Sequence, residues 1–92
     1  MEYINPDNPE LTISVSDTTI VFMKNGRSHN TDGPAIIRYD GSRTCYCQDG
    51  KYHNEHGPAV ITNFTEEEYW LHGQKIYLKS KWEQQVLEER TV

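Results

Sequence analysis

Short runs of alternating or clustered apolar residues make up most of the chain, and this pattern is typical of β-strands. In Leu11–Val15, apolar and polar side chains alternate, as they do in a strand with one buried face. Several other runs have strand length and are rich in aromatic and β-branched residues, which favour strands: Thr19–Lys24 and residues 35–39, 43–48, 59–64 and 67–71. The pattern therefore predicts a mainly β chain.

Dipeptides that favour turns separate these runs. Asn25-Gly26 and Asp49-Gly50 tolerate the positive φ of a tight hairpin turn, and Asp40-Gly41 supplies a further turn. Gly33-Pro34 and Gly57-Pro58 each end one element and fix φ at the start of the next. We therefore expect neighbouring strands to pair antiparallel, as in a β-meander.

The turns belong to an internal repeat of 24 residues. Residues 22–37 and 46–61 share the pattern aromatic-x-x-[Asn/Asp]-Gly-[Arg/Lys]-x-His-Asn-x-x-Gly-Pro-Ala-[Ile/Val]-Ile. The residues that define it recur at the same spacing: His29 and His53, Gly33 and Gly57, Pro34 and Pro58. A third copy starts at Tyr69 and leaves the pattern at Ile76, as the terminal unit of a repeat array does.

The C-terminus changes from a strand pattern to a helical one. Leu78, Trp82 and Val86 lie four residues apart, with Leu87 beside them, and form the apolar stripe of an amphipathic helix. Ser80 begins a capping-box pattern, which predicts the start of the helix near this residue. A helix this short is marginal alone in water, so it docks on the last repeat, on a partner or on a second copy of the chain.

These elements predict a single domain over residues 1–92. Residues 1–20 form an N-terminal loop, around Asn5-Pro6-Asp7-Asn8-Pro9, and a cap strand. Residues 21–77 form the repeat meander, and residues 78–92 form the helix. The predicted fold class is mainly β (α+β): an antiparallel β-meander of about 2.5 stacked repeats with one C-terminal amphipathic helix.

Composition and charge narrow the function classes. The apolar fraction of 35% predicts a thin core. Nine basic and fourteen acidic residues give a net charge of −5, which argues against direct nucleic-acid binding and fits a basic protein partner. The chain has no apolar run long enough for a membrane span and no signal-peptide pattern at its N-terminus, so we expect a cytoplasmic protein.

Histidines and cysteines are the candidate chemical groups. His29 and His53 are equivalent in the repeat, and we expect each buried imidazole to hydrogen-bond the backbone of a turn. Zinc binding by Cys45, Cys47, His53 and His56 is the alternative, but the spacing lacks the usual Cys-x-x-Cys knuckle. The first repeat has apolar residues in place of both cysteines, which indicates reduced core thiols. We expect no metal and no cofactor.

No pattern in the chain indicates catalysis. Gly-x-Ser-x-Gly and phosphate-binding glycine loops are absent from the sequence, and the Glu66-Glu67-Glu68 run is typical of a solvated strand. The aromatic residues are too many for so small a core, so we expect some of them to form a protein interface. The predicted partner-binding residues are Tyr39, Tyr46, Tyr52, Glu66, Glu67, Glu68, Tyr69 and Trp70.

The repeat pattern, followed by Tyr-Trp-Leu-x-Gly-x-x-Ile and a helix that contains tryptophan, resembles the MORN-like repeat of small phage and giant-virus proteins. The resemblance covers about residues 20–92. Such repeats commonly carry arginine after the histidine, where this chain has Asn30 and Asn54. The resemblance implies a stacked β-meander and, less specifically, a phage accessory protein or interaction module.

Three functions remain open, and we do not expect an enzyme. The first hypothesis is a phage-type accessory protein that binds and inhibits or modulates a bacterial host protein, such as a defence or nucleic-acid-processing factor, in the host cytoplasm. The second is a structural module that self-associates, for example as a homodimer. A protein that binds a small ligand or a metal is the third.

Overall fold

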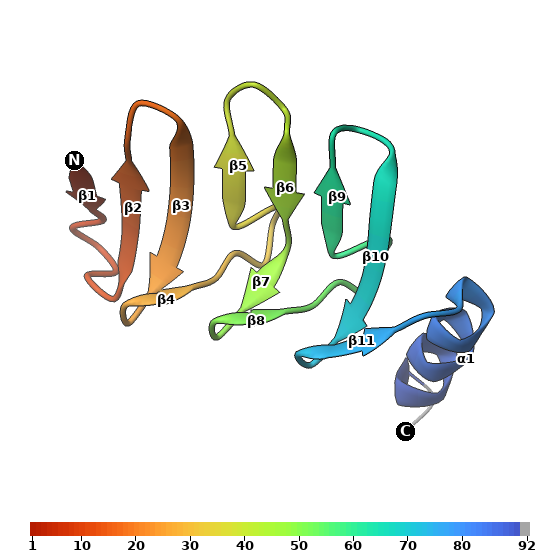
Figure 1. Ribbon diagram of the computed structural model, residues 1–92. Helices are drawn as coiled ribbons and strands as arrows, with labels where there is room; N and C mark the ends of the chain where they lie inside the picture. Colours follow the sequence, from red (N-terminus) through yellow and green to blue (C-terminus); the bar gives the residue numbers. More distant parts are fainter. Residues whose placement is uncertain (91–92) are drawn as a thin grey trace.

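The computed structural model describes residues 1–90 of the chain as an elongated antiparallel sheet with one helix at its C-terminal end (Figure 1). The last two residues of the predicted helix, 91 and 92, lie outside the described part. The molecule measures 39 × 32 × 16 Å, so it is thin in one direction. The prediction of a mainly β chain with a C-terminal helix is confirmed.

Eleven strands and one helix occupy the described residues. The strands are β1 (Glu2–Ile4), β2 (Leu11–Val15), β3 (Thr19–Lys24), β4 (Arg27–Ser28), β5 (Ile36–Arg38), β6 (Arg43–Cys45), β7 (Cys47–Gln48), β8 (Lys51–Tyr52), β9 (Val60–Thr62), β10 (Glu66–Leu71) and β11 (Gln74–Ile76). The helix α1 spans Lys79–Arg90. The main sheet has the order β1-β2-β3-β5-β6-β9-β10-β11, β4 pairs with β3, and β7 pairs with β8 alone.

Three short hairpins, β3–β4, β7–β8 and β10–β11, lie in a row at one end of the strands, at the bottom of Figure 1. Their turns are Asn25-Gly26, Asp49-Gly50 and His72-Gly73, and both residues of each turn have positive φ, between 52° and 80°. Two consecutive positive φ values give a turn whose twist matches that of the strands. Two of these turns match the predicted dipeptides, and the third places a histidine where asparagine or aspartate is more usual.

The loop between β9 and β10 shows backbone strain at an exposed aromatic residue. Phe64 has a φ of 66°, which a residue with a bulky side chain rarely adopts, and it is 76% exposed. Its ring occupies the space that a side chain at Gly41 would need, and Gly41 itself has a φ of 76°. The predicted Asp40-Gly41 turn is therefore present, and Asp40 Oδ1 accepts a hydrogen bond from Ser42 N at 2.9 Å within it.

The core consists of two small clusters. The first contains Ala35, Cys45, Cys47 and Val60, which are almost completely buried. The second contains Leu71 together with Trp82 and Val86 of α1. Both cysteines are free. Burial raises the pKa of the Cys47 thiol, so this side chain is protonated at neutral pH and packs as an apolar residue.

Three predictions about the elements need correction, and one is confirmed. Glu2–Ile4 forms β1, although it lies in a segment that the sequence assigns to a loop. The predicted strand 43–48 is divided at Tyr46, whose N–H binds Ala59 O in place of a sheet partner. The helix begins at Lys79, with the Leu78 carbonyl accepting from Lys81 N and Trp82 N, and this confirms the predicted start near Ser80. Leu78 and Leu87 are 60% and 62% exposed, so the buried stripe of the helix consists of Trp82 and Val86 alone among the residues that the sequence predicts for it.

Candidate binding grooves on the loop face

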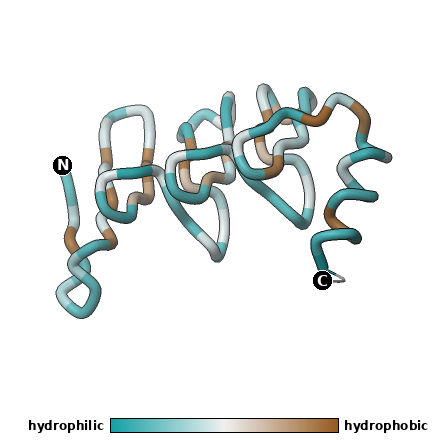
Figure 2. Tube along the Cα trace, turned by 90° about the horizontal axis from the view of Figure 1, so that it is seen from below, coloured by the Kyte–Doolittle hydropathy of each residue, from teal (hydrophilic) through white to brown (hydrophobic). Residues whose placement is uncertain are grey.

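The two copies of the His-Asn-x-x-Gly-Pro motif form loops 29–34 and 53–58, which project to the same side of the sheet as the N-terminal loop and α1 (Figure 2). We call this side the loop face. The order along it is the N-terminal loop, loop 29–34, loop 53–58 and α1. Two of the spaces between these four elements form grooves, one on each side of loop 29–34.

The same side-chain hydrogen bonds shape both loops. Asn30 Nδ2 donates to Pro34 O at 3.1 Å, and Asn54 Nδ2 donates to Pro58 O at 2.9 Å. The amide oxygen of each asparagine accepts from the backbone N–H two residues later, at 3.0 Å and 2.9 Å. An asparagine that binds its own backbone in this way holds a turn closed. The asparagines that replace the arginine of the resembled repeat therefore build the loops.

The repeat histidines connect each loop to the next hairpin. His29 Nδ1 accepts a hydrogen bond from Asp49 N at 3.0 Å, and His53 Nδ1 accepts one from His72 N at 2.9 Å. Asp49 and His72 are the first residues of the following turns. Each imidazole thus satisfies a turn N–H of the next unit, which couples neighbouring units of the array. The ring of His53 also lies 4.5 Å from that of His72.

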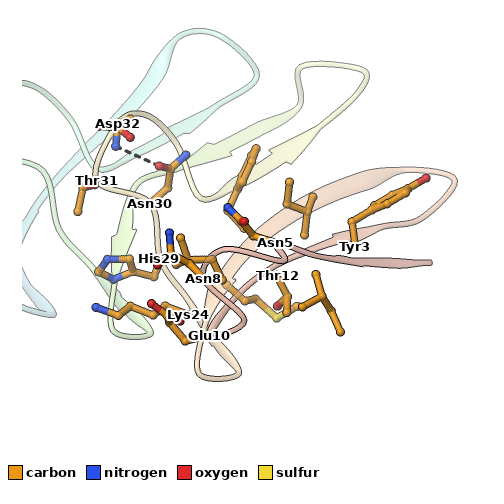
Figure 3. Close-up of a pocket in the computed structure, with 15 residues that line it drawn as sticks. Tyr3, Asn5, Asn8, Glu10, Thr12, Lys24, His29, Asn30, Thr31 and Asp32 are labelled. Carbon is orange, nitrogen blue, oxygen red and sulfur yellow. Dashed lines mark hydrogen bonds between the residues drawn. The ribbon is translucent and has the colours of Figure 1, made fainter.

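A groove lies between the N-terminal segment and loop 29–34, and we call it the apolar groove (Figure 3). Its volume is about 620 Å³, and its lining includes Tyr3, Leu11, Ile13, Phe22 and Met23. In Figure 3, Tyr3 lies at one end of it, and Asn30, Thr31 and Asp32 lie at the other. Its apolar lining comes mainly from β1, β2 and β3.

A second groove of about 480 Å³ lies between loops 29–34 and 53–58, and we call it the acidic groove. Its lining includes Thr31, Asp32, Tyr46, Gln48, Glu55 and His56. No lysine or arginine is among its lining residues within the described chain. Tyr46 is half-buried, and Asp32 is exposed. The groove therefore combines an aromatic surface with two acidic side chains.

The space beyond loop 53–58 is occupied by α1. Trp82 is 7% exposed, and its indole Nε1 donates to Asn54 O at 3.0 Å. Its ring lies 4.9 Å from that of Tyr69 at an interplanar angle of 50°. Arg90 donates to Glu55 O at 3.2 Å and lies 3.4 Å from His56 Nδ1. The helix is thus held by an aromatic contact and by bonds to loop carbonyls.

The predicted partner-binding residues do not lie on one surface. Tyr46 lines the acidic groove, Tyr69 lies under Trp82, and Tyr52 packs edge-on against Trp70 at 5.1 Å. Successive residues of a strand point to opposite faces, which separates Tyr69 from Trp70. Tyr39 is 50% exposed at a turn. Glu66 and Glu67 are exposed on β10, and Glu68 accepts from Trp70 Nε1 at 2.9 Å.

Three groups of the loop face were missed by the sequence reasoning: the loop-building asparagines, the acidic residues Asp32 and Glu55, and Arg90. The asparagines carried a signal, because both follow the repeat histidine at the same spacing and precede Gly-Pro. Asp32 and Glu55 carried none, because they fall at variable positions of the motif. Within residues 1–90, no three His, Cys, Asp or Glu side chains gather as a metal site would require.

The chain was compared with family models, with curated proteins and with solved structures, and none of the three comparisons found a match. The resemblance to the MORN-like repeat therefore stays a prediction. No helix in the described part of the chain is long and apolar enough to cross a membrane.

Proposed function

We propose that this chain is a non-enzymatic binding protein that recognises a basic partner protein through its loop face. The acidic groove carries the proposal, because Asp32 and Glu55 line it together with the half-buried Tyr46, and no lysine or arginine is among its described lining residues. The Glu55 carboxylate lies 3.4 Å from His53 Nε2, whereas the Asp32 carboxylate is exposed. Aromatic residues within an acidic surround favour a partner with exposed basic side chains. The net charge of −5 adds long-range attraction for such a partner.

The resemblance to MORN-like repeats extends this proposal to a class of partner. On this reading the chain holds about 2.5 such repeats, which is supported by the equivalent hydrogen bonds in its two loops. The protein is then a phage-type accessory protein in the cytoplasm of a bacterial host. Its partner is a host protein, such as a defence or nucleic-acid-processing factor, whose basic surface it covers and thereby inhibits.

Self-association is the second candidate function, and the edge strand β1 favours it. β1 pairs with β2 only, so its outer backbone groups have no strand partner in the described chain. Tyr3 and Ile4 on this strand are 53% and 63% exposed. An exposed, partly apolar edge is a template for pairing with a second chain. Molecular mass in solution separates a dimer of this kind from a monomer that binds a different protein.

A pull-down from bacterial lysate with two matched bait variants tests the proposed function. The first variant combines Asp32→Asn with Glu55→Gln in the acidic groove. The second combines Glu66→Gln with Glu67→Gln on β10 and changes the net charge by the same amount. Circular dichroism first establishes that both variants are folded.

We expect the unchanged protein to recover one host protein near one-to-one, with recovery reduced by salt because charges attract the two proteins. The groove variant loses that protein, and the β10 variant keeps it. Equal recovery by both variants removes the loop face from the proposal. Recovery of the bait alone, as a multimer, supports self-association instead.

A further inference from the structure

Loop 53–58 shows which chemical groups a loop of this type binds, because α1 supplies them from the same chain. The carbonyls of Asn54 and Glu55 accept from Trp82 Nε1 and from the Arg90 guanidinium. Tyr69 provides the ring against which the Trp82 indole packs. The bound groups are therefore a flat ring on a tyrosine and planar N–H donors at two adjacent carbonyls.

Loop 29–34 presents the equivalent atoms at the acidic groove. Asn30 and Thr31 correspond to Asn54 and Glu55 in the repeat, and Tyr46 corresponds to Tyr69, three residues before the next hairpin turn. No side chain of residues 1–90 donates a hydrogen bond to the Asn30 or Thr31 carbonyl. The first loop thus has the same acceptors as the second but no helix against it.

Two side-chain differences change the kind of group that fits. Gln48 and Leu71 occupy equivalent positions, each directly before a hairpin turn. Leu71 packs against Trp82, whereas Gln48 lines the acidic groove, so this groove is more polar than the site that holds Trp82. Asp32 is the residue of loop 29–34 that corresponds to His56, which lies beside Arg90 in loop 53–58. The acidic groove therefore has a carboxylate at the position where the second loop has an imidazole. Both changes favour a cationic group over an apolar ring.

We propose that the acidic groove binds the guanidinium group of an arginine side chain from a partner polypeptide. The inference rests on the proposed function and specifies the partner residue that the groove recognises. The planar guanidinium stacks on Tyr46, as Trp82 packs on Tyr69. Its N–H groups donate to the Asn30 and Thr31 carbonyls and to the Asp32 carboxylate. The compact ammonium of lysine neither stacks in this way nor reaches three acceptors in one plane.

A titration followed by NMR tests the proposal on the full chain. The probe is a blocked nine-residue peptide of glycine and serine with three arginines, and a peptide with three lysines is its matched control. Two protein variants each remove one negative charge: Asp32→Asn in the groove and Asp17→Asn in the turn between β2 and β3. We expect amide shifts at Asn30, Asp32 and Tyr46 with the arginine peptide and much weaker binding of the lysine peptide.

Asp32→Asn is expected to weaken binding of the arginine peptide about tenfold, which corresponds to one charge-assisted hydrogen bond. Asp17→Asn is expected to leave it unchanged. Equal binding of both peptides, or shifts confined to other parts of the chain, overturns the inference. If the pull-down recovers a partner but the arginine peptide does not shift the groove, the guanidinium assignment fails and the proposed function stands. If both experiments are negative, both fail.

Discussion

Loops 29–34 and 53–58 have the same internal hydrogen bonds but differ in their contacts with the rest of the chain. Each has the same pair of asparagine hydrogen bonds and the same histidine bond to the next turn. Only loop 53–58 is covered by α1, through Trp82 and Arg90. Within residues 1–90, loop 29–34 has no helix against it and lies between the two grooves, with the acidic groove on one side and the apolar groove on the other.

The difference shows which properties belong to the repeat and which to its position. Hydrogen bonds among motif residues are set by the motif, so they occur wherever the motif does. The bonds to the carbonyls of Asn54 and Glu55 come instead from outside the motif, and within the described chain α1 supplies them. In this array one copy of the loop is covered by α1 and the other is left open, and the open copy is the one to which we assign the proposed binding surface.

Replacing Trp82 by alanine is expected to have the largest effect, because it removes the group that covers loop 53–58. The substitution leaves a cavity beside Leu71 and Val86 and deletes the bond to Asn54 O. We expect a loss of about 3–5 kcal/mol in the free energy of unfolding, enough to unfold much of so small a domain. Urea denaturation followed by circular dichroism measures the loss.

Trp82→Phe is the companion variant for this experiment, because it keeps a ring against Tyr69 but has no N–H donor. It is expected to cost about 1–3 kcal/mol through the unpaired carbonyl and the smaller ring. A Trp82→Ala variant with an unchanged urea midpoint would show that α1 is not a cap of the array.

The two repeat histidines are expected to contribute differently to the free energy of unfolding, although each accepts the same kind of hydrogen bond. The side chain of His53 is 5% exposed and that of His29 is 13% exposed, so water replaces the lost acceptor less easily at His53. We expect His53→Ala to cost about 2–3 kcal/mol and His29→Ala about 1–2 kcal/mol. Thermal or urea unfolding of the two variants measures this order.

Replacing either histidine by asparagine tests the hydrogen bond separately from the ring, because the amide oxygen can accept in place of imidazole Nδ1. His53→Asn should recover part of the stability that His53→Ala loses. If alanine and asparagine variants are equally unstable, packing of the ring and not the bond to His72 N accounts for the loss.

Asn30→Ala and Asn54→Ala are expected to have equal effects, in contrast to the histidines. Each removes one bond to a proline carbonyl and one from a backbone N–H, at nearly the same distances. Both loops are partly solvated, so we expect each change to cost about 1 kcal/mol. Urea midpoints that differ clearly between the two variants would contradict the view that the loop interior belongs to the motif.

Local patterns in the sequence predicted those parts of the fold that local chemistry determines. β2 follows from alternation, β3 from its β-branched and aromatic residues, and two of the three hairpin turns from Asn-Gly and Asp-Gly, because side-chain period, strand propensity and positive φ are properties of a few adjacent residues. β1 was missed because Glu2–Ile4 has no alternation and becomes a strand only by pairing with β2. The interruption at Tyr46 was missed for a similar reason, since its N–H binds the distant Ala59 O.

The grooves could not be predicted because they lie between segments far apart in the sequence. The acidic groove is lined by residues of two loops that lie 24 positions apart in the sequence. It is open because α1 covers loop 53–58 and does not extend to loop 29–34. The contact of Arg90 with Glu55 spans 35 residues and follows no motif. The sequence pattern indicated which residues repeat but not which copy remains accessible.

The smallest expected effect concerns pH and the contact between α1 and the last hairpin. Glu89 Oε1 lies 2.7 Å from His72 Nε2, and this hydrogen bond, with a further one from Gln85, lowers the pKa of the Glu89 carboxyl. A carboxyl whose pKa is lowered in the folded state adds stability at pH values above its ordinary, unfolded-state pKa of about 4.3. That stability is lost as the pH falls through the lowered value.

Glu89→Gln is therefore expected to reduce stability at pH 7 by ~0.5 kcal/mol, as for other exposed pairs, and to have less effect at pH 3. Glu88→Gln is the matched control, because it removes the same charge from the adjacent position of α1, where Glu88 accepts from Gln84 as Glu89 accepts from Gln85. Urea midpoints at the two pH values measure both variants. Since His72 is also the residue whose N–H binds His53, a Glu89→Gln effect that persists at pH 3 would mean that the glutamine disturbs the hairpin itself and not only its hydrogen bond to the helix.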